Sequence, residues 1–213
     1  MDYIINVSGY ILKGSVVTFQ LYLITALLSV LLGTAGALGK ISKIPLLNSF
    51  LSFYTWVFRG TPLLLQLFFA YYGLPVLGIT LEPFPAAALT FTINYGAYFT
   101  EIFRGGIESI DNGQYEAAQV LGMNYRQTMS RIILPQTIKR VLPATSNEAI
   151  NLVKDSALVA VIGLGDLLRA AKVAVTRDFS IIPFIIAAVF YLIISSVIVN
   201  VFRKLENKYS VYE

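Results

Sequence analysis

Polar side chains recur at helical spacing inside one apolar stretch of the chain, residues 86–103. Asn94, Tyr98 and Glu101 follow one another at intervals of four and three, so a helix would present them on one face. A carboxylate inside a membrane helix is costly unless it faces protein or water, so we expect Glu101 to point inward. Such a face can bind a polar or cationic molecule. Alternatively, Glu101 only forms an i,i+3 ion pair with Arg104.

A second apolar stretch, residues 143–167, contains too many polar groups for a helix that faces lipid. Lys154 and Asp155 are adjacent, so on a helix they point about 100° apart and each needs another partner. These polar groups line a cavity or a subunit contact and bind a ligand, or they form an internal salt-bridge network that positions helices. The candidate ligand-binding residues of this stretch are Asn151, Lys154, Asp155 and Ser156.

A break in the apolar pattern precedes a third group of polar residues. Thr61 can cap a new helix and Pro62 suits its first turn, so we predict a helix from Pro62 to about residue 77. Thr61 and Gln66 are candidates for direct contact with a ligand. The alternative interpretation is an ordinary helix start at the membrane surface.

The residue types for covalent and metal chemistry are missing from the sequence. There is no Cys and no His, which removes thiolate ligands and the commonest general base. The phosphate-binding pattern GxxxxGK[ST] does not occur either. We therefore predict that the chain is not an enzyme, with no catalytic residue, no metal site and no cofactor of its own.

Composition predicts an integral membrane protein. Of the 213 residues, 56% are hydrophobic and only 13% are charged, whereas a soluble domain carries about 25% charge. The net charge of +4 comes from cations scattered over loops between apolar segments, which favours membrane orientation over nucleic-acid binding. We predict an all-α fold with one transmembrane domain over 1–213 and an amphipathic lead-in over 1–13. The five expected spans are about 15–38, 62–80, 86–103, 143–167 and 180–202.

Between the third and fourth spans, residues 112–135 are polar and basic and carry signals of local order. Residues 115–121 favour a helix, with Asp111 or Asn112 available as its N-cap. Gly122 suits the left-handed conformation just past a helix end.

A second short helix is predicted directly after this glycine. Asn124 is a suitable N-cap, and Gln127 follows three residues later in the capping-box position. Pro135 interrupts this second helix, since proline lacks the backbone N–H that a helix interior requires.

The same stretch resembles a motif of permease subunits of binding-protein-dependent ABC importers. The motif reads Glu-Ala-Ala, three residues, Gly, nine residues, Ile, any residue and Leu-Pro. In that family the first short helix is a coupling helix that sits in a cleft of the ATPase subunit. The alternative is an ordinary amphipathic helix pair on the membrane surface, which leaves the spacing unexplained. The matching residues are Glu116, Ala117, Ala118, Gly122, Ile132, Leu134 and Pro135.

The resemblance implies the type I ABC importer permease fold and a set of partners. These are an ABC ATPase homodimer that binds ATP and Mg, a second copy of this permease or a homologue, an extracytoplasmic substrate-binding protein and membrane lipid. Residues 58–69, 98–110 and 151–163 also resemble permeases for polar amino acids. We expect import of polar amino acids by alternating access, with a lean to arginine, lysine or histidine.

Other functions are kept open at this point. The first alternative is a glutamine or glutamate importer of the same family. The others are an ion-coupled secondary transporter, which also places carboxylates near the membrane midplane, and a structural or channel-type membrane subunit.

The distribution of cations predicts the orientation in the cytoplasmic membrane. If residues 112–135 are cytoplasmic, eleven cations lie inside and four outside, in agreement with the positive-inside rule. The N-terminus is then outside and the C-terminus cytoplasmic. The four outside are Lys13, Arg169, Lys172 and Arg177; those inside are Lys40, Lys43, Arg59, Arg104, Arg126, Arg131, Lys139, Arg140, Arg203, Lys204 and Lys208.

Overall fold

The computed structural model describes residues 1–42 and 44–209, and Lys43, predicted to lie in a cytoplasmic turn, is outside these ranges. The described residues form helices and connecting turns and contain no strand. The helices are α1 Asp2–Ile41, α2 Pro45–Gly60, α3 Leu63–Phe68, α4 Pro83–Glu108, α5 Asn112–Val120, α6 Tyr125–Thr128, α7 Leu134–Asp155, α8 Leu167–Asp178 and α9 Ile182–Tyr209. The all-α prediction is confirmed.

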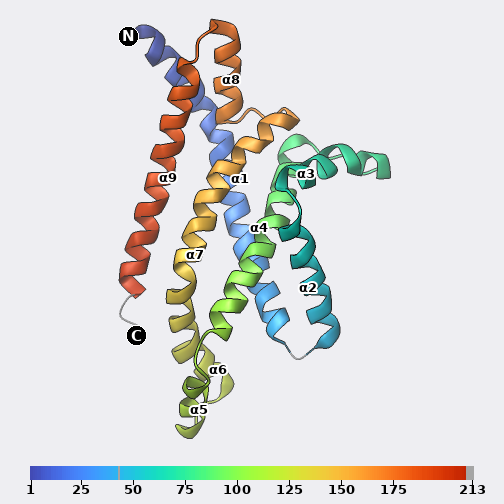
Figure 1. Ribbon diagram of the computed structural model, residues 1–213, viewed down its shortest axis with the longest axis vertical. Coiled ribbons are helices and arrows are strands. Elements are labelled where there is room, and N and C mark those ends of the chain that lie inside the picture. The colour runs from blue at the N-terminus through green and yellow to red at the C-terminus, as the bar shows by residue number, and fades with distance from the viewer. Residues whose placement is uncertain (43, 210–213) are drawn as a thin grey trace.

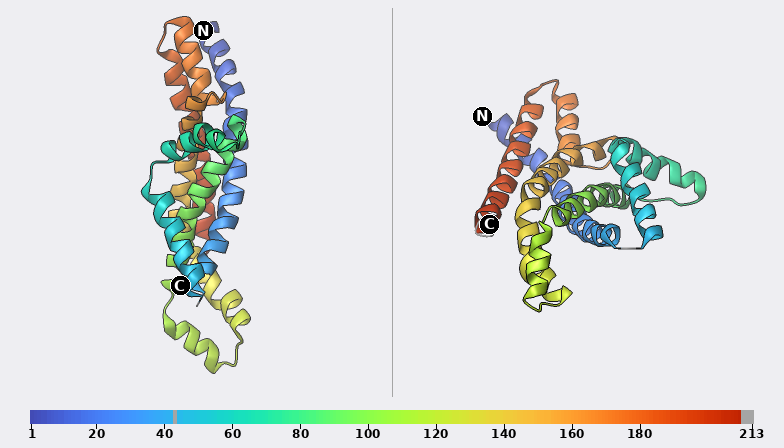
Figure 2. Two further views of the ribbon diagram at one scale, coloured as in Figure 1. Left: turned by 90° about the vertical axis from the view of Figure 1, so that its right-hand side faces the viewer. Right: turned by 60° about the horizontal axis from the view of Figure 1, so that its bottom comes forward.

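The molecule is an elongated bundle with two different ends (Figure 1). The start of α1 lies beside α8 and the start of α9 at one end, while α5 and α6 project at the opposite end. Two further views show the same arrangement (Figure 2). One end therefore carries the predicted coupling stretch, and the other carries α8 with Arg169, Lys172 and Arg177, which were predicted to lie outside.

α1 is one continuous helix of 40 residues, and no break separates the predicted lead-in from the predicted span 15–38. Gly14, which follows the lead-in, does not form a turn. It lies inside the helix and allows close packing against the backbone just before α8. A Cβ on Gly14 would lie 2.7 Å from the backbone oxygen of Asp166. At 1.5 Å per residue the helix is about 60 Å long, roughly twice the thickness of a hydrocarbon core.

Small residues of α1 allow its backbone to approach α4 closely. A Cβ on Gly33 would lie 2.3 Å from the Cβ of Phe99, and one on Gly36 would lie 2.3 Å from the Oγ1 of Thr100. This contact follows the usual pattern of membrane helices, which pack through glycine and other small side chains.

The chain bends by 103° between α2 and the helical segment that follows it. The helix predicted from Pro62 to about residue 77 forms as α3, a π-helical turn Phe69–Gly73 and a 3-10 turn Leu74–Leu77. The predicted cap is wrong, however. The Thr61 hydroxyl donates to the backbone oxygen of Val57 at 2.9 Å, so it closes the end of α2 instead of opening α3.

The predicted fourth span, 143–167, has different boundaries in the structure. α7 begins at Leu134, directly after a π-helical turn Met129–Ile133, and Pro143 lies inside it. The helix tightens into a 3-10 turn, Ser156–Ile162, and ends at Gly163, whose φ is 85°. The short second helix of the coupling stretch is thus continuous with α7.

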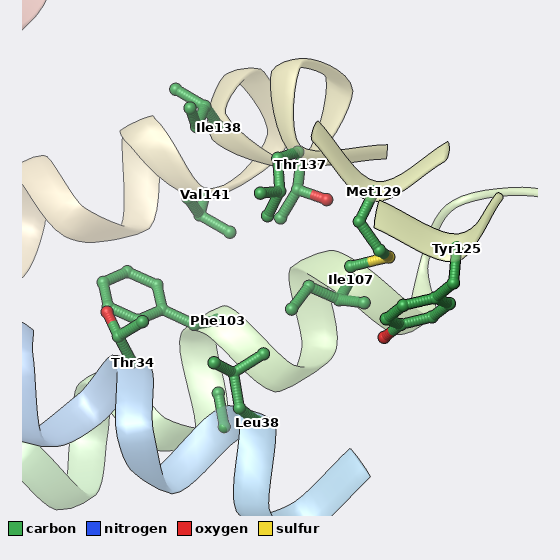
Figure 3. A pocket seen from close by; sticks show the side chains of 11 residues that line it. Thr34, Leu38, Phe103, Ile107, Tyr125, Met129, Thr137, Ile138 and Val141 are labelled. Atoms are coloured by element: carbon green, nitrogen blue, oxygen red, sulfur yellow. The ribbon is translucent and has the colours of Figure 1, made fainter. Parts of the chain in front are cut away.

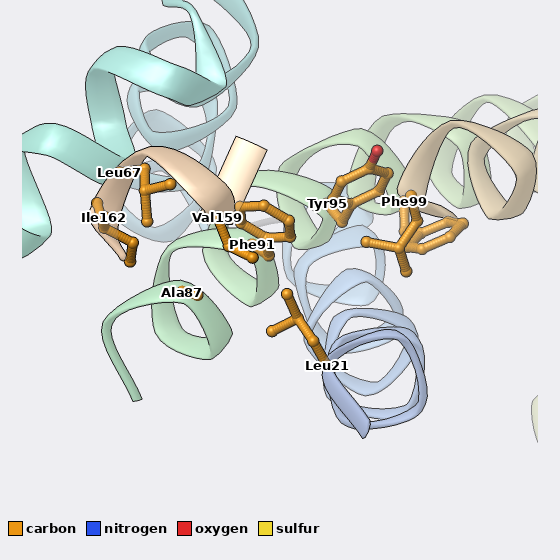
Figure 4. Close-up of a cluster of buried hydrophobic side chains, with 9 residues drawn as sticks. Leu21, Leu67, Ala87, Phe91, Tyr95, Phe99, Val159 and Ile162 are labelled. Atoms are coloured by element: carbon orange, nitrogen blue, oxygen red, sulfur yellow. The ribbon is translucent and has the colours of Figure 1, made fainter. Parts of the chain in front are cut away.

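Two larger clusters of buried side chains form the core of the bundle, and a third, smaller one lies beside the coupling stretch. The first joins α1, α4 and the end of α7 through residues such as Leu21, Phe91 and Val159, and Leu67 of α3 reaches it too (Figure 4). The second lies at the N-terminal end and packs α8 against α1 and α9 through Ile11 and Ala171. α8 lies between the predicted spans 143–167 and 180–202.

Some of the helices have the length and composition of membrane spans. Within the described residues, α1 and α9 qualify, and the bent pair α2 and α3 with its following turns adds a third if counted as one span. α4 and α7 carry the polar residues that lower their hydropathy. The count of five spans stays a prediction.

Candidate coupling loop and transport site

The coupling loop, residues 112–135, has the predicted glycine turn. α5 ends at Val120, and Gly122 follows with a φ of 73°. The backbone N–H of Met123 donates to the oxygen of Ala118, and that of Gly122 donates to the oxygen of Gln119, both at 3.0 Å. This pair of bonds is the Schellman closure of a helix, in which glycine takes the left-handed position without a Cβ clash.

Both short helices of the loop also begin as predicted. Of the two candidate caps for α5, Asp111 is the one used: its carboxylate accepts from the backbone N–H of Gly113 at 2.7 Å. α6 begins with a complete capping box, since Asn124 accepts from the N–H of Gln127 at 3.0 Å and Gln127 accepts from the N–H of Asn124 at 2.9 Å. The loop is therefore an ordered unit.

The motif residues fall into an exposed set and a packed set. Glu116, Ala117 and Gly122 are exposed, and a Cβ on Gly122 would meet nothing within 4 Å. These positions face outward from the tip of the molecule. Leu134 is also exposed, at 39%, whereas Ala118 is buried and Ile132 and Pro135 are half-buried.

Two exposed apolar side chains of the loop were not singled out from the sequence. Val120 is 87% exposed and Leu121 is 76% exposed, immediately before Gly122. The sequence feature that could have identified them is a pair of large apolar residues at the end of an otherwise polar predicted helix. An apolar pair held at a projecting tip is suited to contact another protein.

The loop rests on the bundle through a small cluster and a cavity. Tyr115 and Met129 pack against buried Ile107 and Ile133. Beside this contact, an apolar cavity of about 370 Å³ separates the ends of α1 and α4 from α6 and α7, with Phe103 and Met129 in its wall (Figure 3). The loop is thus anchored but not tightly packed on all sides.

Thr61, Gln66 and Asn94 lie together at the bend after α2. The Gln66 amide donates to the backbone oxygen of Phe58 at 3.0 Å and to the Thr61 hydroxyl at 2.8 Å. The Asn94 amide donates to the same Phe58 oxygen at 2.8 Å and to the Gln66 side-chain oxygen at 3.0 Å. Because these amides occupy carbonyl groups that the bend leaves unpaired, they stabilise it. A ligand contact from them stays a prediction.

Glu101 is the centre of an ion cluster that joins α1, α2 and α4. It pairs with Lys40, accepts from the Thr55 hydroxyl at 3.1 Å, and binds Arg104 through Nη2 at 2.7 Å and Nε at 3.0 Å. A guanidinium nitrogen of Arg59 lies 4.0 Å away. The inward orientation of Glu101 and its i,i+3 pair with Arg104 are confirmed, whereas contact with a ligand is untested.

A polar face forms where α4 meets α7. The Tyr95 hydroxyl donates to Oδ2 of Asp155 at 2.7 Å. Glu148 lies near Asn151 and Asp155, and all three are half-buried. Positions 148, 151 and 155 share one side of a helix. Tyr95 was missed in the sequence. Glu148 was among the polar residues expected to line a cavity but was not chosen as a ligand-binding candidate, although it precedes Asp155 by seven residues, or two helical turns.

The remaining candidates differ in their surroundings. The guanidinium of Arg59 lies 5.5 Å from the ring centre of Tyr98, in cation–π geometry. Arg59 lies in the last turn of helix α2 and not in a loop, and its side chain is 43% exposed. Its predicted cytoplasmic location stays a prediction. Ser156 is buried and donates to the backbone oxygen of Val153 at 2.7 Å. The Lys154 side chain is exposed, whereas the adjacent Asp155 accepts a hydrogen bond from Tyr95 of α4.

Comparison with known proteins identifies the family. Residues 29–211 match the model of the binding-protein-dependent transport system inner membrane component. The chain belongs to this family. The arginine transport system permease protein ArtQ of Bacillus subtilis (strain 168) is 41% identical over 201 residues, which cover 93% of this chain and 92% of that protein. The family predicted from the coupling-loop motif is confirmed, and as a permease subunit the chain is not an enzyme.

Other relatives extend the likeness over nearly the whole chain. A putative glutamine transport system permease protein, GlnP, of Rickettsia bellii (strain RML369-C) is 38% identical over 212 residues, 97% of each chain. A crystal structure of an amino acid ABC transporter with histidines has a TM-score of 0.89 at 36% identity and covers 96% of both chains. The MetNI methionine transporter, 17% identical with a TM-score of 0.79, shares the fold. The type I importer permease fold is confirmed.

Proposed function

We propose that this chain is the transmembrane subunit of an ATP-driven importer of polar amino acids, with a preference for basic ones. The carrying observation is the pair of carboxylates, Glu148 and Asp155, on one face of α7 beside Tyr95 and Tyr98 of α4. Two carboxylates suit a cationic side chain through charge attraction, and Arg59, which lies over the Tyr98 ring, shows that a guanidinium is accommodated beside this face. Asn151 on the same face can hydrogen-bond the polar end groups of an amino acid.

The names of the relatives support this preference. The permease from Bacillus subtilis is an arginine transporter component, and the similar crystal structure holds histidines. Several relatives of nearly equal identity, at 37–38%, are putative glutamine permeases of Rickettsia species. Glutamine is therefore the second candidate substrate. The predicted contribution of Lys154 and Ser156 is weaker, since one is exposed and the other is bonded to its own helix.

The proposed transport cycle needs partners that bind to opposite ends of this chain. An ATPase homodimer, which binds the ATP and Mg, docks on the coupling loop, where Glu116, Ala117 and exposed Leu121 form the contact. Gly122 sets the angle between the two short helices. A second permease copy or homologue completes the pathway, and a substrate-binding protein delivers the amino acid at the other end.

The proposed orientation places the coupling loop and the C-terminus inside the cell and the N-terminus outside. The coupling loop and the N-terminus lie at opposite ends of the bundle, and α9 runs from the N-terminal end toward the other (Figure 1). Arg126 and Arg131 lie at the coupling end. A concentration of cations there agrees with the positive-inside rule.

The deciding experiment measures ATP hydrolysis by the complex reconstituted in lipid with its ATPase and binding protein. We expect stimulation by arginine, lysine or histidine, with glutamine weaker, and loss of that stimulation in Asp155→Asn and Glu148→Gln. Glu82→Gln, at an exposed carboxylate outside this face, is the matched control for removal of one negative charge. Stimulation by glutamine alone would replace the basic preference with the second candidate, and stimulation by no amino acid would refute the substrate class.

A further inference from the structure

All four cations assigned to the external segments gather at one place, beside α8. Arg169, Lys172 and Arg177 line a cavity of about 600 Å³, together with Gly163 at the end of the 3-10 turn. Lys13 of α1 and the same Arg169 line an adjoining cavity of about 280 Å³. Because the positive-inside rule depletes external loops of cations, their concentration at one cavity calls for a specific function.

One of these cations is already neutralised within the chain. Arg177 binds Asp178 through Nε at 2.6 Å and Nη2 at 2.8 Å. This guanidinium lowers the pKa of the Asp178 carboxyl below its ordinary value. The other nearby carboxylate, Asp166, caps α8 and accepts from the backbone N–H groups of Leu168 and Arg169, so its oxygens are occupied as well.

The remaining cations have no carboxylate partner among the described residues. The Nη1 atom of Arg169 is buried and has no hydrogen-bond partner in the described part of the chain. It lies over Gly163, where a Cβ would be only 2.8 Å away. Lys172 is exposed at the cavity rim, and Lys13 is exposed on α1. A buried guanidinium nitrogen without an acceptor is costly, which indicates that an anion completes the site.

We propose that this basic cavity binds an acidic side chain, Asp or Glu, of the extracytoplasmic substrate-binding protein. The planar guanidinium of Arg169 suits a carboxylate, and Lys172 adds a flexible second donor. The cavity lies at the end of the molecule opposite the coupling loop, where the family's binding protein must arrive (Figure 1). This inference rests on the proposed orientation and goes beyond the proposed function by naming the residues of the docking site.

The test measures binding of the purified binding protein, loaded with arginine, to the complete transporter in nanodiscs of neutral lipid. We expect Lys172→Glu to weaken the affinity by about tenfold and to flatten its dependence on salt, because like charges at an interface repel. Arg169→Gln should weaken it similarly. The matched control is Lys204→Glu, which makes the same charge change at an exposed position near the C-terminal end of α9. Lys204 does not line either cavity, so this variant should leave the affinity unchanged.

ATP hydrolysis in the same preparations separates this inference from the proposed function. With excess binding protein, Lys172→Glu should reach the wild-type maximal rate at a higher half-saturating concentration, which also shows that the variant is folded. Wild-type affinity in both Lys172→Glu and Arg169→Gln would overturn the docking site while leaving the importer intact. The docking site would also be overturned if the variants changed only how ATP hydrolysis responds to anionic lipid added to the nanodiscs, because the cavity would then bind a lipid phosphate. Failure of the wild-type complex to respond to any amino acid would count against the function itself.

Discussion

Removal of the Glu101 carboxylate should destabilise the protein far more than removal of a neighbouring carboxylate that binds the same arginine. The Glu101 side chain is only 15% exposed and its partner Lys40 only 10% exposed, so Glu101→Gln leaves a nearly buried ammonium without its counter-charge. Breaking such a pair from one side costs about 3 kcal/mol, at the lower end of measured values for buried pairs. Thr55 remains as a hydrogen-bond partner but carries no charge.

The chain supplies its own control in Glu108, which also pairs with Arg104 but is 50% exposed. Glu108→Gln should cost about 0.5 kcal/mol or less, as expected for an exposed i,i+4 pair. Thermal unfolding of the purified complex in detergent compares the two. At about 2–4 °C per kcal/mol for a chain of this size, Glu101→Gln should lower the melting temperature by roughly 10 °C. Equal shifts for the two variants would refute the argument.

A double variant separates stability from ligand binding at this position. Lys40→Met removes the stranded ammonium, so Lys40→Met with Glu101→Gln should recover most of the lost melting temperature. If Glu101 also contacts the amino acid, substrate stimulation of ATP hydrolysis stays low in the stable double variant. If it only joins α1, α2 and α4, stimulation returns with stability.

Three further substitutions test the packing, the loop and the bend. Gly33→Val should destabilise the α1–α4 contact by about 1–3 kcal/mol, whereas Gly9→Ala, where a Cβ meets nothing within 4 Å, should leave the melting temperature unchanged or slightly raised. Gly122→Ala forces a side chain into a left-handed conformation at a cost of about 1–2 kcal/mol, so we expect weaker ATPase docking together with a melting temperature lowered by roughly 2–8 °C. Asn94→Leu removes one hydrogen-bond donor from the Phe58 backbone oxygen and one from the Gln66 side-chain oxygen. We expect a melting temperature lowered by several degrees, measured by differential scanning fluorimetry.

The coupling loop was predictable from the sequence because its structure is local. Gly122 closes a helix that ends two residues earlier, and the Asn124 capping box spans four residues, so each signal and its partner lie within one turn. The motif that identified the family lies in the same segment. The presence of long helices was likewise predictable from the length of the apolar stretches. In α9, for example, no charged residue interrupts residues 182–194.

The bend after α2 and the partners of the polar residues were not predictable. Thr61 and Pro62 look like the start of a helix in the sequence, yet the amides that hold the bend come from Gln66 and from Asn94, 28 residues further along the chain. Such a contact depends on tertiary packing, which cannot be predicted from the spacing of apolar and polar residues along one helix. The same limit applies to Tyr95, whose partner Asp155 is 60 residues away.

α4 physically connects the functional regions of the molecule. It contains 26 residues and is about 39 Å long at 1.5 Å per residue. Near its C-terminal end, Ile107 contacts the coupling loop, and a Cβ on Gly106 would lie 2.2 Å from Val141 of α7, so both helices are packed together close to that loop. Tyr95 and Asp155 link the same two helices again further along. In the proposed cycle, a displacement of the loop by the ATPase should therefore move both walls of the proposed substrate face, because each wall is part of a helix that reaches the loop.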